Sequence, residues 1–62
     1  MANGRKLVTQ AVLMPEGLVI AFSDGALVFQ QNPMAPVMLP GPATALRYYP
    51  ELAILSVAFF RN

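Results

Sequence analysis

The chain has 62 residues, of which 56% are hydrophobic and 11% charged, with a formal net charge of +1 and no cysteine or histidine. This length allows at most one domain, 1–62. The missing residue types exclude disulfides and the usual zinc ligands, so no metal or cofactor is expected. Soluble domains usually carry about 25% charged residues, so the composition predicts that part of the apolar surface meets other protein chains.

No segment has the pattern of a membrane span or a secretory signal. Residues 26–46 are uncharged but contain four prolines together with glutamine and asparagine, which a membrane-spanning helix does not tolerate. The apolar segment 52–60 is too short to span a bilayer. Arg5 and Lys6 precede an apolar run that is soon interrupted by polar and turn residues. We therefore expect no transmembrane span and a cytoplasmic or virion-associated protein.

Residues 7–30 predict a three-strand meander. Residues 7–14 are β-prone, and the following Pro15-Glu16-Gly17 reads as a turn because proline fixes φ and glycine supplies the unusual conformation. Two further β-prone runs are joined by Asp24 and Gly25, a pair typical of a two-residue type I′ hairpin turn.

A two-residue turn at Asp24 and Gly25 would place Phe22 opposite Leu27 in the predicted hairpin. Neighbouring residues of a strand point to opposite faces, so this register divides the hairpin into two faces. The expected core face holds Leu18, Ile20, Phe22, Leu27 and Phe29, and the opposite face holds Val19, Ala21, Val28, Ser23 and Gln30. The larger side chains make the first face the predicted core side.

The rest of the chain predicts a connector and two more strands. Residues 31–42 contain four prolines and no periodicity, which is typical of an extended connector. Residues 43–60 read as strands 43–49 and 52–60, separated at Pro50-Glu51. Strand 52–60 is apolar on both faces, a pattern of strands that are covered on both sides. The predicted fold class is all-β, a small five-strand meander or barrel.

A short internal repeat links the two halves of the chain. Thr9, Pro15 and Glu16 recur 35 positions later as Thr44, Pro50 and Glu51. The repeat predicts that a strand, a proline turn and a second strand occur twice. Its spacing resembles that of β-propeller blades, which adds a propeller-like fragment to the alternatives.

The sequence offers no recognisable catalytic site. Ser23 lies beside Asp24, but nucleophilic catalysis by serine requires a base, and the chain has no histidine. The carboxylates of Glu16, Asp24 and Glu51 each fall in a predicted turn, with no reason to converge within one chain. We expect a protein that is not an enzyme; the exception would be an oligomer in which copies of Asp24 or Glu51 meet on a symmetry axis.

Aromatic residues beside cations suggest a second function. Arg47, Tyr48 or Tyr49, and Arg61 could stack on bases and neutralise phosphates, so a small β-barrel binding single-stranded nucleic acid is the alternative prediction. Four cations in the whole chain are few for such a protein.

The preferred function is a non-enzymatic structural or interaction subunit of a larger assembly, either a homo-oligomer or a hetero-complex such as a virion or shell component. A fragment of a longer protein is a further alternative, because the chain ends soon after an apolar strand. The connector and the last strand carry the predicted interface, which comprises Met34, Val37, Met38, Leu39, Leu52, Ile54, Leu55, Val57, Phe59 and Phe60.

Overall fold

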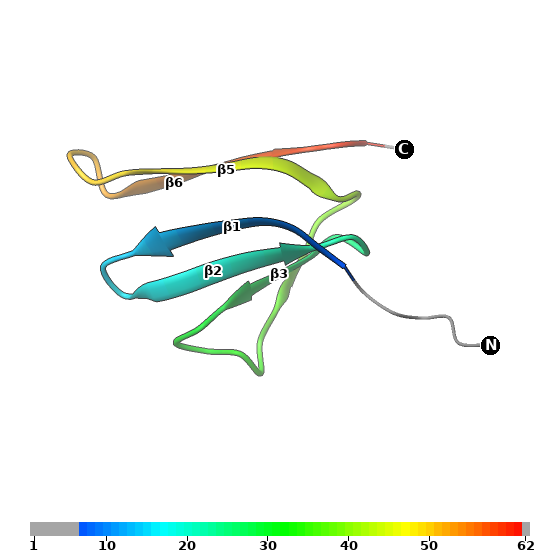
Figure 1. Ribbon diagram of the computed structural model, residues 1–62, viewed down its shortest axis with the longest axis horizontal. Coiled ribbons are helices and arrows are strands. Elements are labelled where there is room, and N and C mark those ends of the chain that lie inside the picture. Colours follow the sequence, from blue (N-terminus) through cyan, green and yellow to red (C-terminus); the bar gives the residue numbers. More distant parts are fainter. Residues whose placement is uncertain (1–6, 62) are drawn as a thin grey trace.

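The computed structural model describes residues 7–61, which form six β-strands and no helix (Figure 1). This confirms the all-β class but corrects the expected number of strands from five to six. The strands are β1 (Val8–Met14), β2 (Gly17–Phe22), β3 (Ala26–Phe29), β4 (Val37–Met38), β5 (Ala43–Tyr49) and β6 (Ile54–Phe59).

The strands form two antiparallel sheets, one with the order β1-β2-β3-β4 and one with β5-β6. The predicted meander of the first three strands is confirmed. β5 runs alongside β1, so the second sheet packs next to the first (Figure 1).

The extra strand, β4, lies inside the proline-rich connector, where the sequence predicted no sheet. Val37 of β4 pairs with Leu27 of β3, and the amide of Leu39 donates to the carbonyl of Gly25 at 2.8 Å. The connector also contains a turn, because the amide of Ala35 donates to the carbonyl of Asn32. Proline at either end keeps this strand short, since proline has no amide to donate.

The loop of the β2–β3 hairpin has three residues, so the predicted two-residue turn is wrong. Phe22 and Gly25 are joined by a hydrogen bond from the Gly25 amide to the Phe22 carbonyl at 3.1 Å, and Gly25 has a φ of +95°. Asp24 stabilises the loop by accepting a hydrogen bond from the amide of Ala26 at 3.0 Å. A turn followed by a glycine with positive φ is a common three-residue hairpin loop.

This one-residue difference reverses the faces of β2. Ala21 lies opposite Leu27, and Val19 lies opposite Phe29. Val19 and Ala21 are therefore buried, at 1% and 0% exposure, whereas the expected core residue Ile20 faces the other side. Because side chains alternate along a strand, a one-residue shift moves a whole set of side chains to the opposite face.

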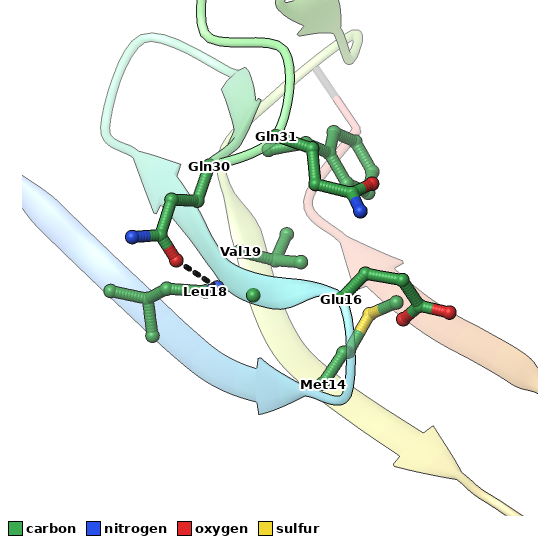
Figure 2. A pocket seen from close by; sticks show the side chains of 8 residues that line it. Met14, Glu16, Leu18, Val19, Gln30 and Gln31 are labelled. Atoms are coloured by element: carbon green, nitrogen blue, oxygen red, sulfur yellow. Dashed lines mark hydrogen bonds between the residues drawn. The ribbon is translucent and has the colours of Figure 1, made fainter.

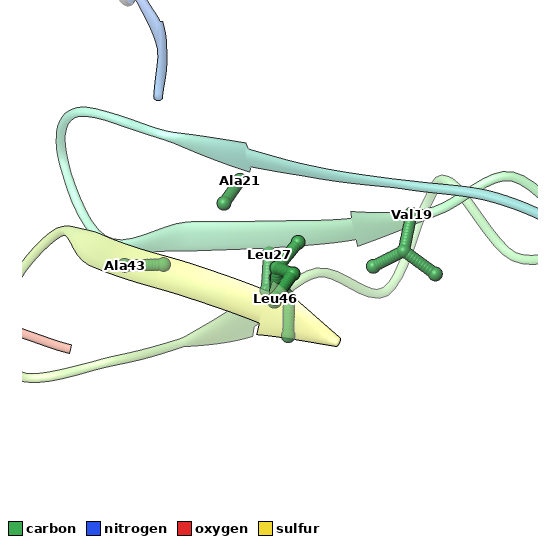
Figure 3. Close-up of a cluster of buried hydrophobic side chains, with 5 residues drawn as sticks. All are labelled: Val19, Ala21, Leu27, Ala43 and Leu46. Carbon is green, nitrogen blue, oxygen red and sulfur yellow. The ribbon is translucent and has the colours of Figure 1, made fainter. Parts of the chain in front are cut away.

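The hydrophobic core lies between the two sheets (Figure 3). The first sheet contributes Val19, Ala21 and Leu27, and the second contributes Ala43 and Leu46. Further half-buried apolar residues pack against this cluster: Val12, Met14, Phe29, Leu39, Leu55 and Val57. The buried side chains are small, so the core is thin.

The predicted repeat of strand, proline turn and strand is confirmed, although the turns differ in length: Met14 pairs with Gly17, whereas Tyr49 pairs with Ile54. β1 and β5 have seven residues each and start 35 positions apart. Both strands carry an irregularity in their pairing at the same place, between Val8 and Gln10 in β1 and between Ala43 and Ala45 in β5. The two hairpins therefore share a strand length and a β-bulge, a feature that bends a strand.

β6 starts later than the expected strand 52–60. The amide of Leu52 donates to the Tyr49 carbonyl at 3.1 Å, and the amide of Ala53 donates to the Pro50 carbonyl at 3.3 Å, so both residues belong to the turn. Ala53 has a φ of +52°, a left-handed conformation that residues with a side chain rarely adopt.

Candidate functional site

One face of the four-stranded sheet is apolar, and we call it the outer face. It lies on the side of the four-stranded sheet opposite to the core, and no other strand of residues 7–61 lies over it. Its members alternate with the core residues along each strand: Val8, Ala11, Leu13, Leu18, Ile20, Phe22, Val28 and Met38. Leu13 is 73% exposed, and none of the eight side chains is polar.

Reasoning from the sequence missed the outer face because it placed Ile20 and Phe22 in the core. The deciding signal is the length of the loop before Ala26, which sets the register of the hairpin. The two-residue turn would make Ser23 a strand residue, but its amide donates to the carbonyl of Leu7 at 2.7 Å, and its hydroxyl accepts from the Leu7 amide at 3.1 Å. These contacts hold Ser23 in the loop.

The residues of the predicted interface fall into two groups. Leu39, Leu55 and Val57 are half-buried and pack against the core cluster, so their apolar surface is partly covered within the chain. The others are exposed: Met34, Val37, Met38, Leu52, Ile54, Phe59 and Phe60. Met34 is 90% exposed, and only Met38 among them belongs to the outer face. The outer face is therefore a separate apolar surface, on the first sheet, that shares only Met38 with the predicted interface.

β6 is covered on one face by its own chain. Leu55 lies opposite Tyr48, and Val57 lies opposite the buried Leu46, so these residues face the core. Ile54, Ser56 and Ala58 alternate with them and are exposed. One of the two apolar faces that the sequence predicted is thus partly covered by the core cluster.

The cationic and aromatic residues of the alternative function are only partly brought together. Arg47 and Tyr49 alternate with the core-facing Tyr48, so they share the exposed side of the β5–β6 hairpin. Arg47 lies opposite Ser56, five residues before Arg61. At about 3.3 Å per strand residue, Arg61 lies roughly 16 Å farther along. The structure therefore displays one cation with one tyrosine, and Arg61 lies apart from them.

The three carboxylates occupy separate turns. Glu16 and Glu51 lie in the equivalent turns of the two hairpins, and Asp24 lies in the β2–β3 loop. Figure 1 shows the β1–β2 and β5–β6 turns at one end of the molecule and the β2–β3 loop at the other. Within residues 7–61, no three potential metal ligands lie close together, and no polar or charged side chain is buried.

A small pocket of about 260 Å³ lies beside the β1–β2 turn (Figure 2). Met14, Val19 and Phe29 supply apolar walls, and Gln30 and Gln31 supply polar ones. Its volume is below the range of about 300–1,000 Å³ that is usual for ligand pockets.

The turn beside this pocket depends on Gly17 and Gln30. The Oε1 atom of Gln30 accepts from the Leu18 amide at 2.8 Å. Gly17 has a φ of +138°, and a Cβ atom there would lie 2.8 Å from the same Oε1 atom. With Pro15 in the turn before it, Gly17 acts as the sequence predicted, and this polar contact fixes the end of the hairpin.

Comparison with known proteins gives no further information. Residues 7–61 hold no helix with the length and apolar character that crossing a membrane requires. No family model matches the chain, and neither a curated protein nor a solved structure is similar to it. The resemblance to propeller blades stays a prediction from the sequence.

Proposed function

We propose that this protein is a non-enzymatic subunit of a larger assembly and that its outer face is covered there by another chain. The observation that carries the proposal is the outer face itself, which presents eight apolar side chains on one sheet. Continuous apolar patches of this kind mark interaction sites, whereas single exposed apolar residues are ordinary. A homo-oligomer or a hetero-complex such as a virion or a shell satisfies this requirement.

The internal repeat supports this proposal. Leu46 and Tyr48 in β5 correspond to Ala11 and Leu13 in β1, each displaced by 35 positions. In β5 this set of residues faces the core, and Leu46 is 8% exposed. In β1 the same set lies on the outer face, where Leu13 is exposed. The two hairpins thus bury opposite faces, and the face that the second hairpin buries is left uncovered on the first.

The small core gives a second line of support. A domain of about 60 residues buries only about 60% of the surface that its unfolded chain exposes. Domains of this size usually need disulfides, a metal or oligomerisation, and the chain has no cysteine or histidine. Covering the outer face would add the apolar burial that the thin core lacks.

Sedimentation of the purified chain at micromolar concentration tests the proposal. We expect a particle larger than the 6.7 kDa chain. Leu13→Lys should reduce the mass of the particle without unfolding the chain, because Leu13 is 73% exposed on the outer face. Thr44→Lys is the matched control, because it adds the same charge at an exposed position of the equivalent strand, away from the outer face. A wild-type chain that is monomeric and cooperatively folded would overturn the proposal.

The second candidate is binding of single-stranded nucleic acid, which the shared exposed side of Arg47 and Tyr49 favours. Binding would weaken as salt is raised, because it would release counterions from phosphates. Tyr49→Ala should remove stacking, whereas Tyr48→Phe should leave binding unchanged because Tyr48 faces the core. An oligonucleotide that fails to bind at low salt would exclude this candidate.

A further inference from the structure

The outer edge of β6 is an unprotected strand edge. Within residues 7–61, β6 has β5 as its sole hydrogen-bonded neighbour. Its sequence, Ile54–Phe59, contains no charge and no proline, and the bulge of this hairpin lies in β5 instead. Charged residues, prolines and bulges are the usual devices that prevent a strand edge from pairing with another chain. β6 has none of them.

The other edges of the two sheets are protected. β4 is only two residues long and has Pro36 before it and Pro40 two residues after it. β1 has β5 running alongside it (Figure 1). In the first hairpin, the outer edge of β2 is occupied by β3. The corresponding edge of the second hairpin, on β6, has no strand among the described residues.

The alternating direction of amides and carbonyls along β6 identifies which backbone groups point to its outer edge. The Phe60 amide donates to the carbonyl of Pro42 at 2.9 Å, so the backbone groups of Phe60 point towards the β5 side. In an antiparallel strand, the amide and carbonyl of alternate residues point to the same side. The amides and carbonyls of Leu55, Val57 and Phe59 therefore point away from β5, towards the open edge.

We propose that β6 pairs antiparallel with β6 of a second copy, joining the two hairpins into a continuous four-stranded sheet. This inference rests on the proposed function, names a second copy of the chain as the partner, and adds a contact at the β6 edge to the one at the outer face. A two-fold axis perpendicular to the sheet makes such a contact self-complementary, as in most homodimers. Because this axis leaves each face of the sheet on the same side in both copies, paired residues have their side chains on the same face.

One register fits the edge best, and it places Val57 opposite its own copy. Leu55 then pairs with the second copy's Phe59, so all three outward-pointing residues of each strand form hydrogen-bonded pairs. Centring on Ser56 or Ala58 instead would leave one of these residues without a partner in the opposing strand. The Val57-centred register also places the exposed Ile54 opposite the second copy's exposed Phe60, a favourable aromatic–β-branched pair.

Charge supports the same register. Arg61 is the cation that follows β6, and Glu51 is the acid in the turn before it. Centring on Val57 brings Arg61 opposite the second copy's Ala53, two residues from the second copy's Glu51. Each end of the paired strands would then carry one cation near one acid, whereas the strands themselves are uncharged.

Single cysteines can determine the register, because the natural chain has no cysteine. Val57→Cys places two thiols opposite each other at a Cα separation of about 5.5 Å, which a disulfide can bridge. Ser56→Cys and Ala58→Cys are the matched controls, one for each neighbouring register. In the Val57-centred register, either control thiol lies diagonally from its copy at about 7–8 Å, which is too far for a disulfide without movement of the backbone.

We expect mild oxidation to convert most Val57→Cys chains to a disulfide-linked dimer while the two controls stay mainly monomeric. If disulfides formed by random collision of chains, Ser56→Cys and Ala58→Cys would crosslink more than Val57→Cys, because Ser56 and Ala58 are exposed and Val57 is half-buried. In the wild-type chain, the Val57 amide should exchange with solvent more slowly at a concentration at which the chain assembles than after dilution to monomers. This second measurement does not depend on the folding of a cysteine variant.

Sedimentation of the wild-type chain separates failure of this inference from failure of the proposed function. A particle whose Val57→Cys form does not crosslink, and whose Val57 amide exchanges freely, would overturn the β6 contact and leave the proposed function standing. Preferential crosslinking of the Ser56→Cys or the Ala58→Cys variant would overturn the register. A cooperatively folded monomer would overturn both proposals.

Discussion

The register of the β2–β3 hairpin decides which side of the first sheet is the core, and a matched pair of substitutions tests it. Val19→Thr and Val28→Thr make the same change on neighbouring strands, replacing a methyl group with a hydroxyl of similar size. Val19 is 1% exposed and lies between Val12 and Phe29, which have no polar side-chain atoms. Val28 lies opposite Ile20 on the outer face. The structure therefore predicts a large loss of stability for Val19→Thr alone.

The expected size of the difference follows from the burial of Val19. A buried hydroxyl without a hydrogen-bond partner costs about 1–3 kcal/mol in proteins, whereas surface substitutions usually change stability by less than about 0.5 kcal/mol. At about 0.05–0.15 kcal/mol per residue, a chain of this length has a free energy of unfolding of about 3–9 kcal/mol. Val19→Thr should therefore remove a substantial fraction of the total stability. Threonine and valine both favour strands, so strand propensity contributes little.

Urea unfolding followed by far-ultraviolet circular dichroism measures this difference. With a slope of about 1 kcal/mol per molar urea, the midpoint should fall by about 1–3 M for Val19→Thr and by less than about 0.5 M for Val28→Thr. Both substitutions are made in the Leu13→Lys variant, in which the outer face is uncovered, because assembly is linked to stability. If Val19→Thr were no more destabilising than Val28→Thr, Val19 would not be a core residue and the three-residue loop would be wrong.

The remaining predictions concern the turns and are measured by the same unfolding experiment. Gly25→Ala should destabilise the chain by about 1–3 kcal/mol, because φ is +95° and the new Cβ would lie 2.7 Å from the Leu39 carbonyl oxygen; unchanged stability would contradict the loop conformation. Ala53→Gly should stabilise the chain by up to about 1 kcal/mol by relieving a φ of +52°, and any loss would show that Ala53 is not left-handed in solution. Gly17→Ala should cost less in a Gln30→Ala background, because the Oε1 atom that the new Cβ meets is then gone; additive effects would contradict that contact.

Much of the fold could be predicted from local sequence signals. Strand 43–49 and the turns at Pro15 and Asp24 follow from β-prone runs bounded by turn residues. The repeat of Thr9 as Thr44 correctly indicated two related hairpins, and the structure adds that both carry the same bulge. These features depend on neighbouring residues, which is why the sequence alone was sufficient for them.

The faces of the sheet could not be predicted in the same way. Asp24-Gly25 fits both a two-residue and a three-residue loop, and the choice depends on the contacts of Ser23 with Leu7, which is 16 residues away. A two-residue loop would place Ile20 in the core and Val19 on the opposite face, the reverse of what the structure shows. The β4 strand was missed because its two residues carry no periodic pattern, and its pairing with β3 is a tertiary contact.

The predicted interface differs from the exposed apolar surface for the same reason. Strand 52–60 is apolar on both sides, so the sequence predicts Leu55 and Val57 in an interface, but both pack against the core cluster. The outer face is not predicted from the sequence because the expected register places Leu18, Ile20 and Phe22 in the core. Interaction surfaces of this kind depend on which side of a sheet is already covered, and this is set by register and by the packing of the sheets.

The most direct test of the central claim is whether the outer face is covered in the native particle. Met38 lies on the outer face and is 61% exposed within the chain, so peroxide should oxidise it readily in a dissociated subunit. Oxidation at this residue can be quantified by mass spectrometry in the wild-type particle and in the Leu13→Lys variant. We predict strong protection of Met38 in the wild-type particle and loss of that protection in the variant. Equal oxidation of Met38 in both would contradict the claim that another chain covers the outer face.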